Sequence, residues 1–448
     1  MLTLIEAAEQ IRNRRLSPLE LTGECLARIE QLNPVLNAFI TVTAETALDE
    51  ARQAEAEIAA GNWRGPLHGI PIGLKDLFDT AGVRTTAASN QYRDRVPTED
   101  AELVRRLKQA GAVIVGKLNM HEFAFGMSGV VSAFGPTRNP WNTERITGGS
   151  SSGAAAAVAA GMCLAALGTD TSGSVRCPSA LCGIVGHRPS RGLLSMKGVI
   201  PLSTSFDTAG PMARTVHDAA IVIDTLTASA NYASLLEEDV SALRIGIARK
   251  SFFDDLQPDV AACMDQAEDV IRELVSQVRE VEVPLDAFRT IFDAEIYEYH
   301  EAMASKTPGL YDARTLYRVQ KCAGTSATAY IRERHRLAKF RSAAERIFEE
   351  VDVVITPTTP AAAPKLADLE ALEIPDVRPF EVKCLLRNTA PFSSLYWPST
   401  SVPCGFTGDG LPVGMQISSK PGGDSTTLRL AYAYEQATEW RKKQLGRL

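Results

Sequence analysis

The chain has 448 residues, of which 45% are hydrophobic, so it can bury a large core and is not expected to be disordered. Its 54 acidic and 47 basic residues are scattered along the sequence and leave a net charge of −7. That balance excludes the basic field that nucleic acid or an anionic membrane surface would require. Eight cysteines lie far apart without a CxxC pair, which is typical of reduced thiols.

The sequence carries no pattern of export or membrane insertion. Residues 1–15 have helical periodicity that includes two acidic residues, where a signal peptide would have a basic start and an uninterrupted apolar stretch. The longest apolar run, residues 154–168, is rich in Ala and Gly and falls short of the roughly 20 residues of a spanning helix. We therefore expect a cytoplasmic protein that contacts no membrane.

Helical and strand patterns alternate over the first part of the chain. Ser17-Pro18-Leu19-Glu20 combines a capping box with proline at the first helical position and predicts the start of a helix. His68 to Leu74 alternates as a strand, which places Lys75 at the end of that strand. Apolar periodicity also predicts helices over residues 4–11, 44–60 and from Thr98 to Gly111, and strands over 38–42 and 112–115.

The composition changes at Gly148, after which Gly, Ser and Ala dominate. A loop, an Ala-rich helix to about Ala160, a strand over 164–168 and a second Gly/Ser loop are predicted there. Farther along we expect strands over 244–248, 351–355, 401–404 and 413–417, amphipathic helices over 258–350 and a last helix from Ser425. Because no linker or repeat divides the chain, we predict one α/β domain over 1–448, a central twisted mixed sheet with helices on both faces.

Two Gly/Ser loops hold the strongest functional signal. Residues 148–153 read Gly-Gly-Ser-Ser-Ser-Gly before a helix, which taken alone is more often a tight turn than an anion site. Residues 168–176 read Gly-Thr-Asp-Thr-Ser-Gly-Ser-Val-Arg, and Ser174 in that loop lies 24 residues after Ser150. With Lys75 at the end of an earlier strand, these loops resemble the amidase signature family. The resemblance extends to residues 116–123, 139–141, 181–183, 206–214 and 411–416, and so covers most of the chain.

The resemblance implies that Ser174 is the nucleophile, Ser150 a bridging serine held by a cis Gly149–Ser150 bond, and Lys75 the base. A serine hydroxyl needs such a base to take its proton during attack, and a lysine can act as one only when neutral. Burial disfavours the ammonium form and lowers the pKa of a lysine, so Lys75 has to be buried. A signature core that carries these residues, 65–220, would precede a variable, helix-rich specificity region over residues 225–400.

The loop before the nucleophile offers backbone N–H groups to a developing oxyanion. The candidate donors are those of Thr171, Ser172, Gly173 and Ser174. Ser172 stands where the family commonly has glycine, and so adds a side chain beside the pocket. We expect the flanking Asp170 and Arg176 to form a structural ion pair rather than to contact substrate.

The resemblance also implies which residues contact the substrate. When the sequence is aligned with the family at Asn119, Ala124 falls where relatives have a pocket-lining residue, and Met127 and Ser128 follow it. The phenylalanines nearby make these surroundings apolar, which favours a small or aryl-containing amide. The sequence does not exclude a urea-like substrate.

Three functions remain to be compared. The leading hypothesis is an amidase that hydrolyses the C–N bond of a small carboxamide to a carboxylate plus ammonia or amine, through an acyl-enzyme on Ser174. The second is the glutaminase subunit of a tRNA-dependent amidotransferase, and the third is a non-catalytic anion-binding module.

His187 or His217 could complete a conventional serine triad, but no G-x-S-x-G turn surrounds any serine. No cofactor or metal is expected, because the histidines lack ligand spacing. The expected partner is a small-molecule amide, and a homodimer is allowed.

Overall fold

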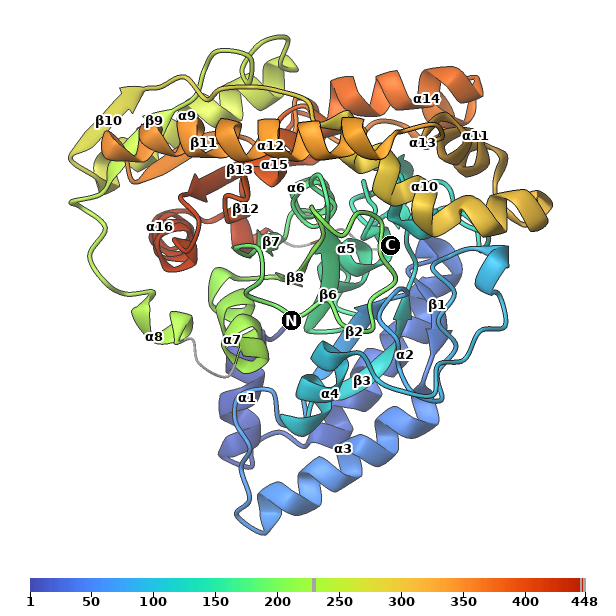
Figure 1. Cartoon of the computed structure of the whole chain (residues 1–448). Helices are drawn as coiled ribbons and strands as arrows, with labels where there is room; N and C mark the ends of the chain where they lie inside the picture. Colours follow the sequence, from blue (N-terminus) through green and yellow to red (C-terminus); the bar gives the residue numbers. More distant parts are fainter. Residues whose placement is uncertain (228–230, 444, 446–448) are drawn as a thin grey trace.

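One sheet of eleven strands runs through the molecule in the order β1-β3-β2-β6-β8-β7-β12-β13-β11-β9-β10 (Figure 1). The structure is a computed structural model that describes residues 1–227, 231–443 and 445. The strands are β1 (Phe39–Val42), β2 (Pro71–Lys75), β3 (Val113–Leu118), β6 (Ala165–Asp170), β7 (Val185–Arg188), β8 (Thr208–Ala213), β9 (Arg244–Ile247), β10 (Gln277–Glu280), β11 (Val353–Pro357), β12 (Ser399–Phe406) and β13 (Pro412–Ser419). A separate hairpin pairs β4 (Arg138–Asn139) with β5 (Asn142–Ile146).

The sheet is mixed, as the sequence predicts. β2 lies between β3 and β6 and runs parallel to both, with Ile72 opposite Ile114 on one side and Ala165 on the other. β8 then pairs antiparallel with β6 and β7, and β9 pairs parallel with β10 and β11. The parallel group β3-β2-β6 brings the carboxyl ends of three strands to one edge, where Lys75 and the loop that holds Ser174 lie.

Both faces of the sheet are covered, because side chains alternate between two apolar clusters. In β3, Val113 and Val115 belong to the cluster that contains α5, whereas Ile114 belongs to the larger cluster that contains α4 and α7. The helices are α1 (Leu4–Arg12), α2 (Pro18–Leu36), α3 (Ala44–Ala59), α4 (Glu102–Gln109), α5 (Ser152–Ala159), α6 (Arg176–Cys182), α7 (Val216–Thr227), α8 (Tyr232–Leu235), α9 (Pro258–Leu274), α10 (Arg289–Lys306), α11 (Ala313–Lys321), α12 (Ala327–Ala344), α13 (Leu366–Glu370), α14 (Ile374–Glu381), α15 (Ala390–Leu395) and α16 (Asp424–Ala437).

Several elements differ from their predicted positions. The helix expected from Thr98 begins later, with Ala101 as its N-cap, and the strand expected from His68 begins at Pro71. The sequence patterns do not predict β7 or β8, and β8 contains Pro211, which pairs with Leu167 in the middle of the sheet. Proline cannot donate to a strand ladder and usually argues against a central strand, so only the tertiary pairing reveals β8.

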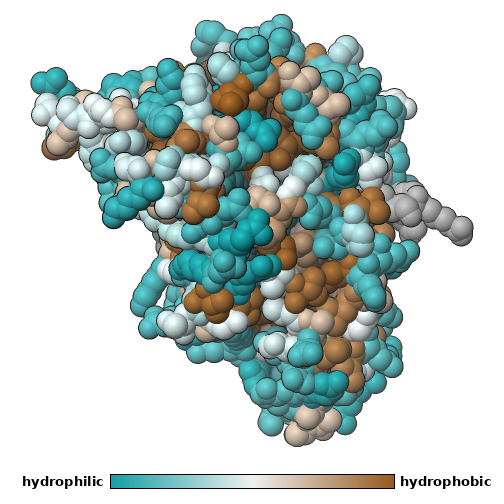
Figure 2. Space-filling view, turned by 90° about the vertical axis from the view of Figure 1, so that its right-hand side faces the viewer, coloured by the Kyte–Doolittle hydropathy of each residue, from teal (hydrophilic) through white to brown (hydrophobic). Residues whose placement is uncertain are grey.

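Of the region predicted to be helix-rich, α10, α11, α12 and α14 gather in the upper part of the molecule in Figure 1. In the described part of the chain, no helix is long and apolar enough to cross a membrane. Figure 2 shows the face that carries β1, with apolar patches between hydrophilic residues in its lower half. Val35 and Val42, 48% and 40% exposed, contribute apolar surface in α2 and the edge strand β1.

Candidate active site

Lys75 is the last residue of β2, and its side chain is completely buried. Its Nζ donates to Ser150 Oγ at 2.7 Å and to Thr169 Oγ1 at 2.8 Å. Thr169 lies near the end of β6, the parallel neighbour of β2, so the strand pairing itself brings lysine and threonine together. The predicted lysine and bridging serine are thus in direct contact.

Burial lowers the pKa of Lys75 from its ordinary 10.5 to about 7, although Asp207 and Asp170 oppose that shift electrostatically. Burial also raises the pKa of Asp207, to about 6, despite its hydrogen bonds. Asp207 accepts from Thr171 Oγ1 at 2.6 Å and from the N–H of Ser203 at 3.0 Å. A lysine with a pKa near 7 is a free amine in a large fraction of molecules at neutral pH, which is the form a base requires.

The two Gly/Ser loops lie against each other at Ser150 and Ser174. The Gly149–Ser150 bond is cis, as the resemblance implied, and the N–H of Ser151 donates to the carbonyl of Ser174 at 3.3 Å. The hydroxyl of Ser174 donates to Met127 Sδ at 3.3 Å. Among the residues that the structure describes, no hydrogen bond joins the hydroxyls of Ser150 and Ser174. The structure therefore brings Lys75 and Ser150 together, with Ser174 turned toward the methionine.

The backbone N–H of Gly173 already donates a hydrogen bond to Asp170, so it is not available to an oxyanion. Its N–H donates to Asp170 Oδ1 at 2.8 Å, so the sequence expectation that it faces an oxyanion does not fit this structure. Its φ of +135° suits glycine, and a Cβ there would lie 2.1 Å from Thr389 Oγ1. The N–H groups of Thr171, Ser172 and Ser174 have no acceptor among the described residues and remain the candidate donors.

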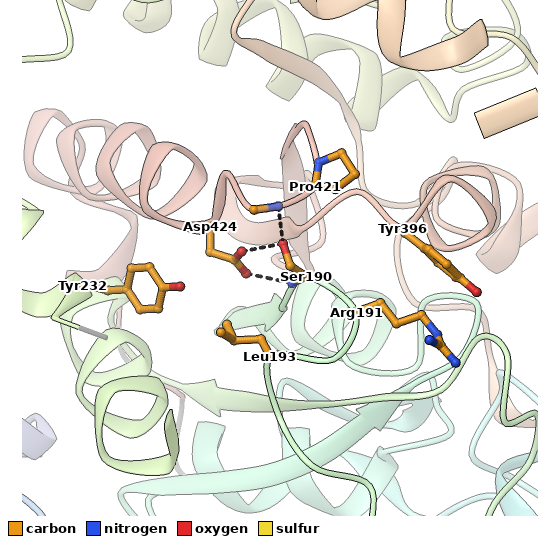
Figure 3. Close-up of a pocket in the computed structure, with 8 residues that line it drawn as sticks. Ser190, Arg191, Leu193, Tyr232, Tyr396, Pro421 and Asp424 are labelled. Atoms are coloured by element: carbon orange, nitrogen blue, oxygen red, sulfur yellow. Dashed lines mark hydrogen bonds between the residues drawn. The ribbon is translucent and has the colours of Figure 1, made fainter. Parts of the chain in front are cut away.

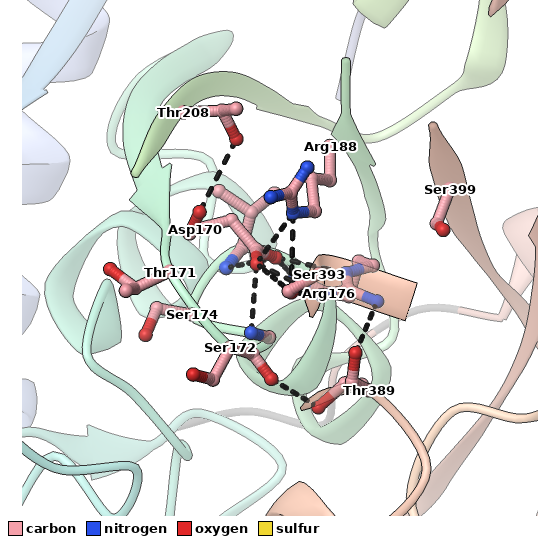
Figure 4. A network of polar contacts seen from close by, with 12 residues as sticks. Asp170, Thr171, Ser172, Ser174, Arg176, Arg188, Thr208, Thr389, Ser393 and Ser399 are labelled. Atoms are coloured by element: carbon pink, nitrogen blue, oxygen red, sulfur yellow. Dashed lines mark hydrogen bonds and ion pairs between the residues drawn. The ribbon is translucent and has the colours of Figure 1, made fainter. Parts of the chain in front are cut away.

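Asp170 and Arg176 form a buried network behind the loop that carries Ser174 (Figure 4). Their side chains lie 2.9 Å apart and are fully buried, and Arg188 Nε lies 3.3 Å from the same carboxylate. Burial raises the pKa of Asp170, but Arg176 and Arg188 outweigh burial and hold the pKa at about 2. Figure 4 shows Thr171 and Ser174 turned away from this network, so the ion pair shapes the loop from behind.

The three predicted pocket residues have different environments. Met127 reaches Ser174, as described above, whereas Ser128 Oγ lies 3.5 Å from His121 Nδ1. Ala124 is buried in the larger apolar cluster beside Phe123. The structure records no hydrogen bond of Ser128 to Ser174 in the part of the chain it describes.

Sequence reasoning gave no role to three residues that contact the site: Thr169, Asp207 and Thr389. Asp207 lies in the segment 206–214 that carries the family resemblance, and this was a usable signal. Thr389 Oγ1 donates to the carbonyl of Ser172 at 2.7 Å, and its carbonyl accepts from Arg176 at 3.0 Å. Nothing in the sequence around Thr389 indicates these contacts, because they join segments more than two hundred residues apart.

The histidines considered as alternative bases make other contacts. His187 hydrogen-bonds to Thr400 Oγ1 at 2.8 Å and to Asp424 Oδ1 at 3.2 Å, while the His217 ring packs on Tyr432. Asp424 also lines a surface pocket with Ser190, whose N–H and hydroxyl both donate to its carboxylate (Figure 3). In the described residues, no group of three or more His, Cys, Asp or Glu side chains could hold a metal ion.

A protein-family model described as Amidase matches residues 20–428. The chain belongs to the amidase family. The A subunit of the glutamyl-tRNA(Gln) amidotransferase from Geobacter metallireducens is 37% identical over 493 aligned positions that cover 99% of each chain. Among solved structures, a 6-aminohexanoate cyclic dimer hydrolase complexed with substrate has a TM-score of 0.90 at 28% identity, covering 99% of this amidase and 98% of that chain. A peptide amidase from Stenotrophomonas maltophilia has a TM-score of 0.83 at 32% identity, covering 97% and 96% of the two chains.

Proposed function

We propose that this amidase hydrolyses the C–N bond of a small carboxamide through an acyl-enzyme on Ser174, with Ser150 and Lys75 as the proton relay. The observation that carries the proposal is the buried Lys75 Nζ, 2.7 Å from Ser150 Oγ, with a pKa of about 7. A neutral amine beside a hydroxyl is the arrangement that general-base activation of a serine needs.

The relay needs one local change. Ser174 Oγ leaves Met127 Sδ by rotating about its Cα–Cβ bond toward Ser150, a change between staggered rotamers. Its proton then passes to Ser150 Oγ while the proton of Ser150 passes to Lys75 Nζ. As the carboxamide carbon is attacked, its oxygen becomes negative beside the N–H groups of Thr171, Ser172 and Ser174. Lys75 returns the proton to the leaving nitrogen, and water then hydrolyses the ester.

A fluorophosphonate probe tests the nucleophile directly. We expect covalent labelling at Ser174 in the wild-type chain, no labelling in Ser174→Ala, and strongly slowed labelling in Lys75→Met. Ammonia release from a panel of L-glutamine, propionamide, benzamide and biuret should disappear in Ser174→Ala. Hydrolysis that persists unchanged in that variant would refute the proposal.

A second candidate is the glutaminase subunit of an amidotransferase, which the similarity to the Geobacter metallireducens protein favours. The aligned length of 493 positions exceeds the 448 residues of this chain, so that relative has segments without a counterpart here. Turnover of L-glutamine by the chain, stimulated by a partner, would support this candidate. Turnover of other amides by the purified chain without any hydrolysis of glutamine would remove it.

A further inference from the structure

Residues 125–128, called here the Met127 segment, are held against the nucleophile loop by their backbone. The N–H groups of Met127 and Ser128 both donate to Glu381 Oε1, at 3.0 and 3.2 Å. The carbonyl of Phe125 accepts from Arg318 Nη1 at 2.6 Å. Because Met127 Sδ contacts Ser174 Oγ, this segment lies directly beside Ser174.

The two side chains that hold the Met127 segment form a buried ion pair of their own. Glu381, the last residue of α14, is fully buried, and Arg318 on α11 is 6% exposed. Arg318 Nη2 lies 3.0 Å from Glu381 Oε2, and Arg378 Nη1 lies 3.8 Å from the same oxygen. One carboxylate oxygen therefore binds the segment and the other faces the arginines. Burial raises the pKa of Glu381, but Arg318, His121, Arg378 and the N–H of Met127 together outweigh burial and hold the pKa at about 2. The bonds to Met127 and Ser128 are therefore charge-assisted at neutral pH.

The Met127 segment continues into a cluster of aromatic rings, in which Phe125 and Phe206 are buried. The Phe125 ring lies 6.1 Å from the Phe292 ring on α10, and Phe292 lies 6.4 Å from Phe206. Phe206 directly precedes Asp207, which binds the hydroxyl of Thr171 in the nucleophile loop. Aromatic side chains thus belong to both the Met127 segment and the segment that holds Asp207, and aromatic rings pack favourably against apolar or aryl groups.

We propose that Glu381 and Arg318 are positioning residues that hold the Met127 segment as one wall of the substrate site, against which an apolar acyl group packs. The inference rests on the proposed role of Ser174 as nucleophile. It gives residues of α11 and α14 an effect on specificity without contact with the reacting atoms.

The test removes both buried partners, and it leaves Arg378, which lies 3.8 Å from Glu381 Oε2, with a side chain that is 31% exposed to solvent. The double variant Glu381→Met/Arg318→Met replaces a buried ion pair by apolar side chains of similar size, which is often close to neutral in stability. Glu381→Gln is the conservative variant, because its amide oxygen can still accept from Met127 and Ser128. Asp218→Asn is the matched control, since Asp218 is equally buried and accepts the N–H of Ile5 at 3.0 Å away from this pair.

Two readouts distinguish positioning from a merely structural role. Hydrogen exchange in a peptide spanning 121–131 should accelerate in the double variant, less in Glu381→Gln and not in Asp218→Asn. Phenylmethanesulfonyl fluoride and methanesulfonyl fluoride both react with an activated serine, but only the first has an aryl group to pack on the wall. We expect the rate of the aryl reagent to fall about tenfold or more in the double variant, as a misplaced wall implies, and that of the small one to stay within about twofold.

Equal loss for both reagents, or wild-type rates and exchange in the double variant, would overturn the inference. Failure of the proposed function looks different, because then neither reagent would label Ser174 in the wild-type chain. The exchange experiment would still report whether Glu381 and Arg318 hold the segment.

Discussion

Replacing Lys75 by methionine should remove activity and stabilise the fold, most strongly at low pH. The fall from an ordinary pKa of 10.5 to about 7 corresponds to about 5 kcal/mol of folding free energy lost when the lysine is protonated in both states, at about 1.36 kcal/mol per pKa unit. Methionine avoids that cost but leaves the hydroxyls of Ser150 and Thr169 without this partner, which costs about 1–2 kcal/mol. We expect Lys75→Met to be about 3 kcal/mol more stable than the wild type at pH 6.

The sign of the pH dependence follows from proton binding. Between pH 7 and pH 10.5 the unfolded chain holds a proton on Lys75 that the folded chain does not, so wild-type stability rises with pH in this window. The difference in unfolding free energy between Lys75→Met and the wild type should therefore fall by about 4 kcal/mol from pH 6 to pH 10. Urea unfolding of both proteins at the two pH values measures it. A difference that is independent of pH, or a destabilised variant at pH 6, would refute a buried lysine of lowered pKa.

The other predictions concern the pH profile and the loop that carries Ser174. With Lys75 as the base, kcat/KM should rise about tenfold per pH unit below 7 and level off above it, measured by ammonia release. Gly173→Ala should lose about 1–3 kcal/mol of unfolding free energy in denaturant titration, because its φ is +135° and Thr389 occupies the Cβ position. Arg176→Met should lose about 3–5 kcal/mol, because it leaves Asp170 with less compensation for its buried charge; a loss below about 1 kcal/mol would contradict this.

Local patterns were sufficient for many elements of the fold. The capping box at Ser17 and Glu20 forms as predicted, and the helices and strands with strong periodicity lie within a few residues of their expected positions. β7 and β8 could not be predicted, since β8 carries Pro211 and both strands are short and fully buried. Their place in the sheet depends on pairing with β6 and β12, which no local pattern records.

The candidate site, like the fold, could be predicted from the sequence only in part. The amino-acid sequence was enough to predict the mixed α/β fold and the family, and to select Lys75, Ser150 and Ser174 as candidates, because long motifs with fixed residue types carry that information. Three contacts became visible only in the folded chain: Lys75 is buried against Ser150 and Thr169, the N–H of Gly173 donates to Asp170, and Glu381 and Arg318 hold the Met127 segment. These contacts join segments far apart in the chain, and burial, distance and the resulting charge state exist only once those segments are packed together.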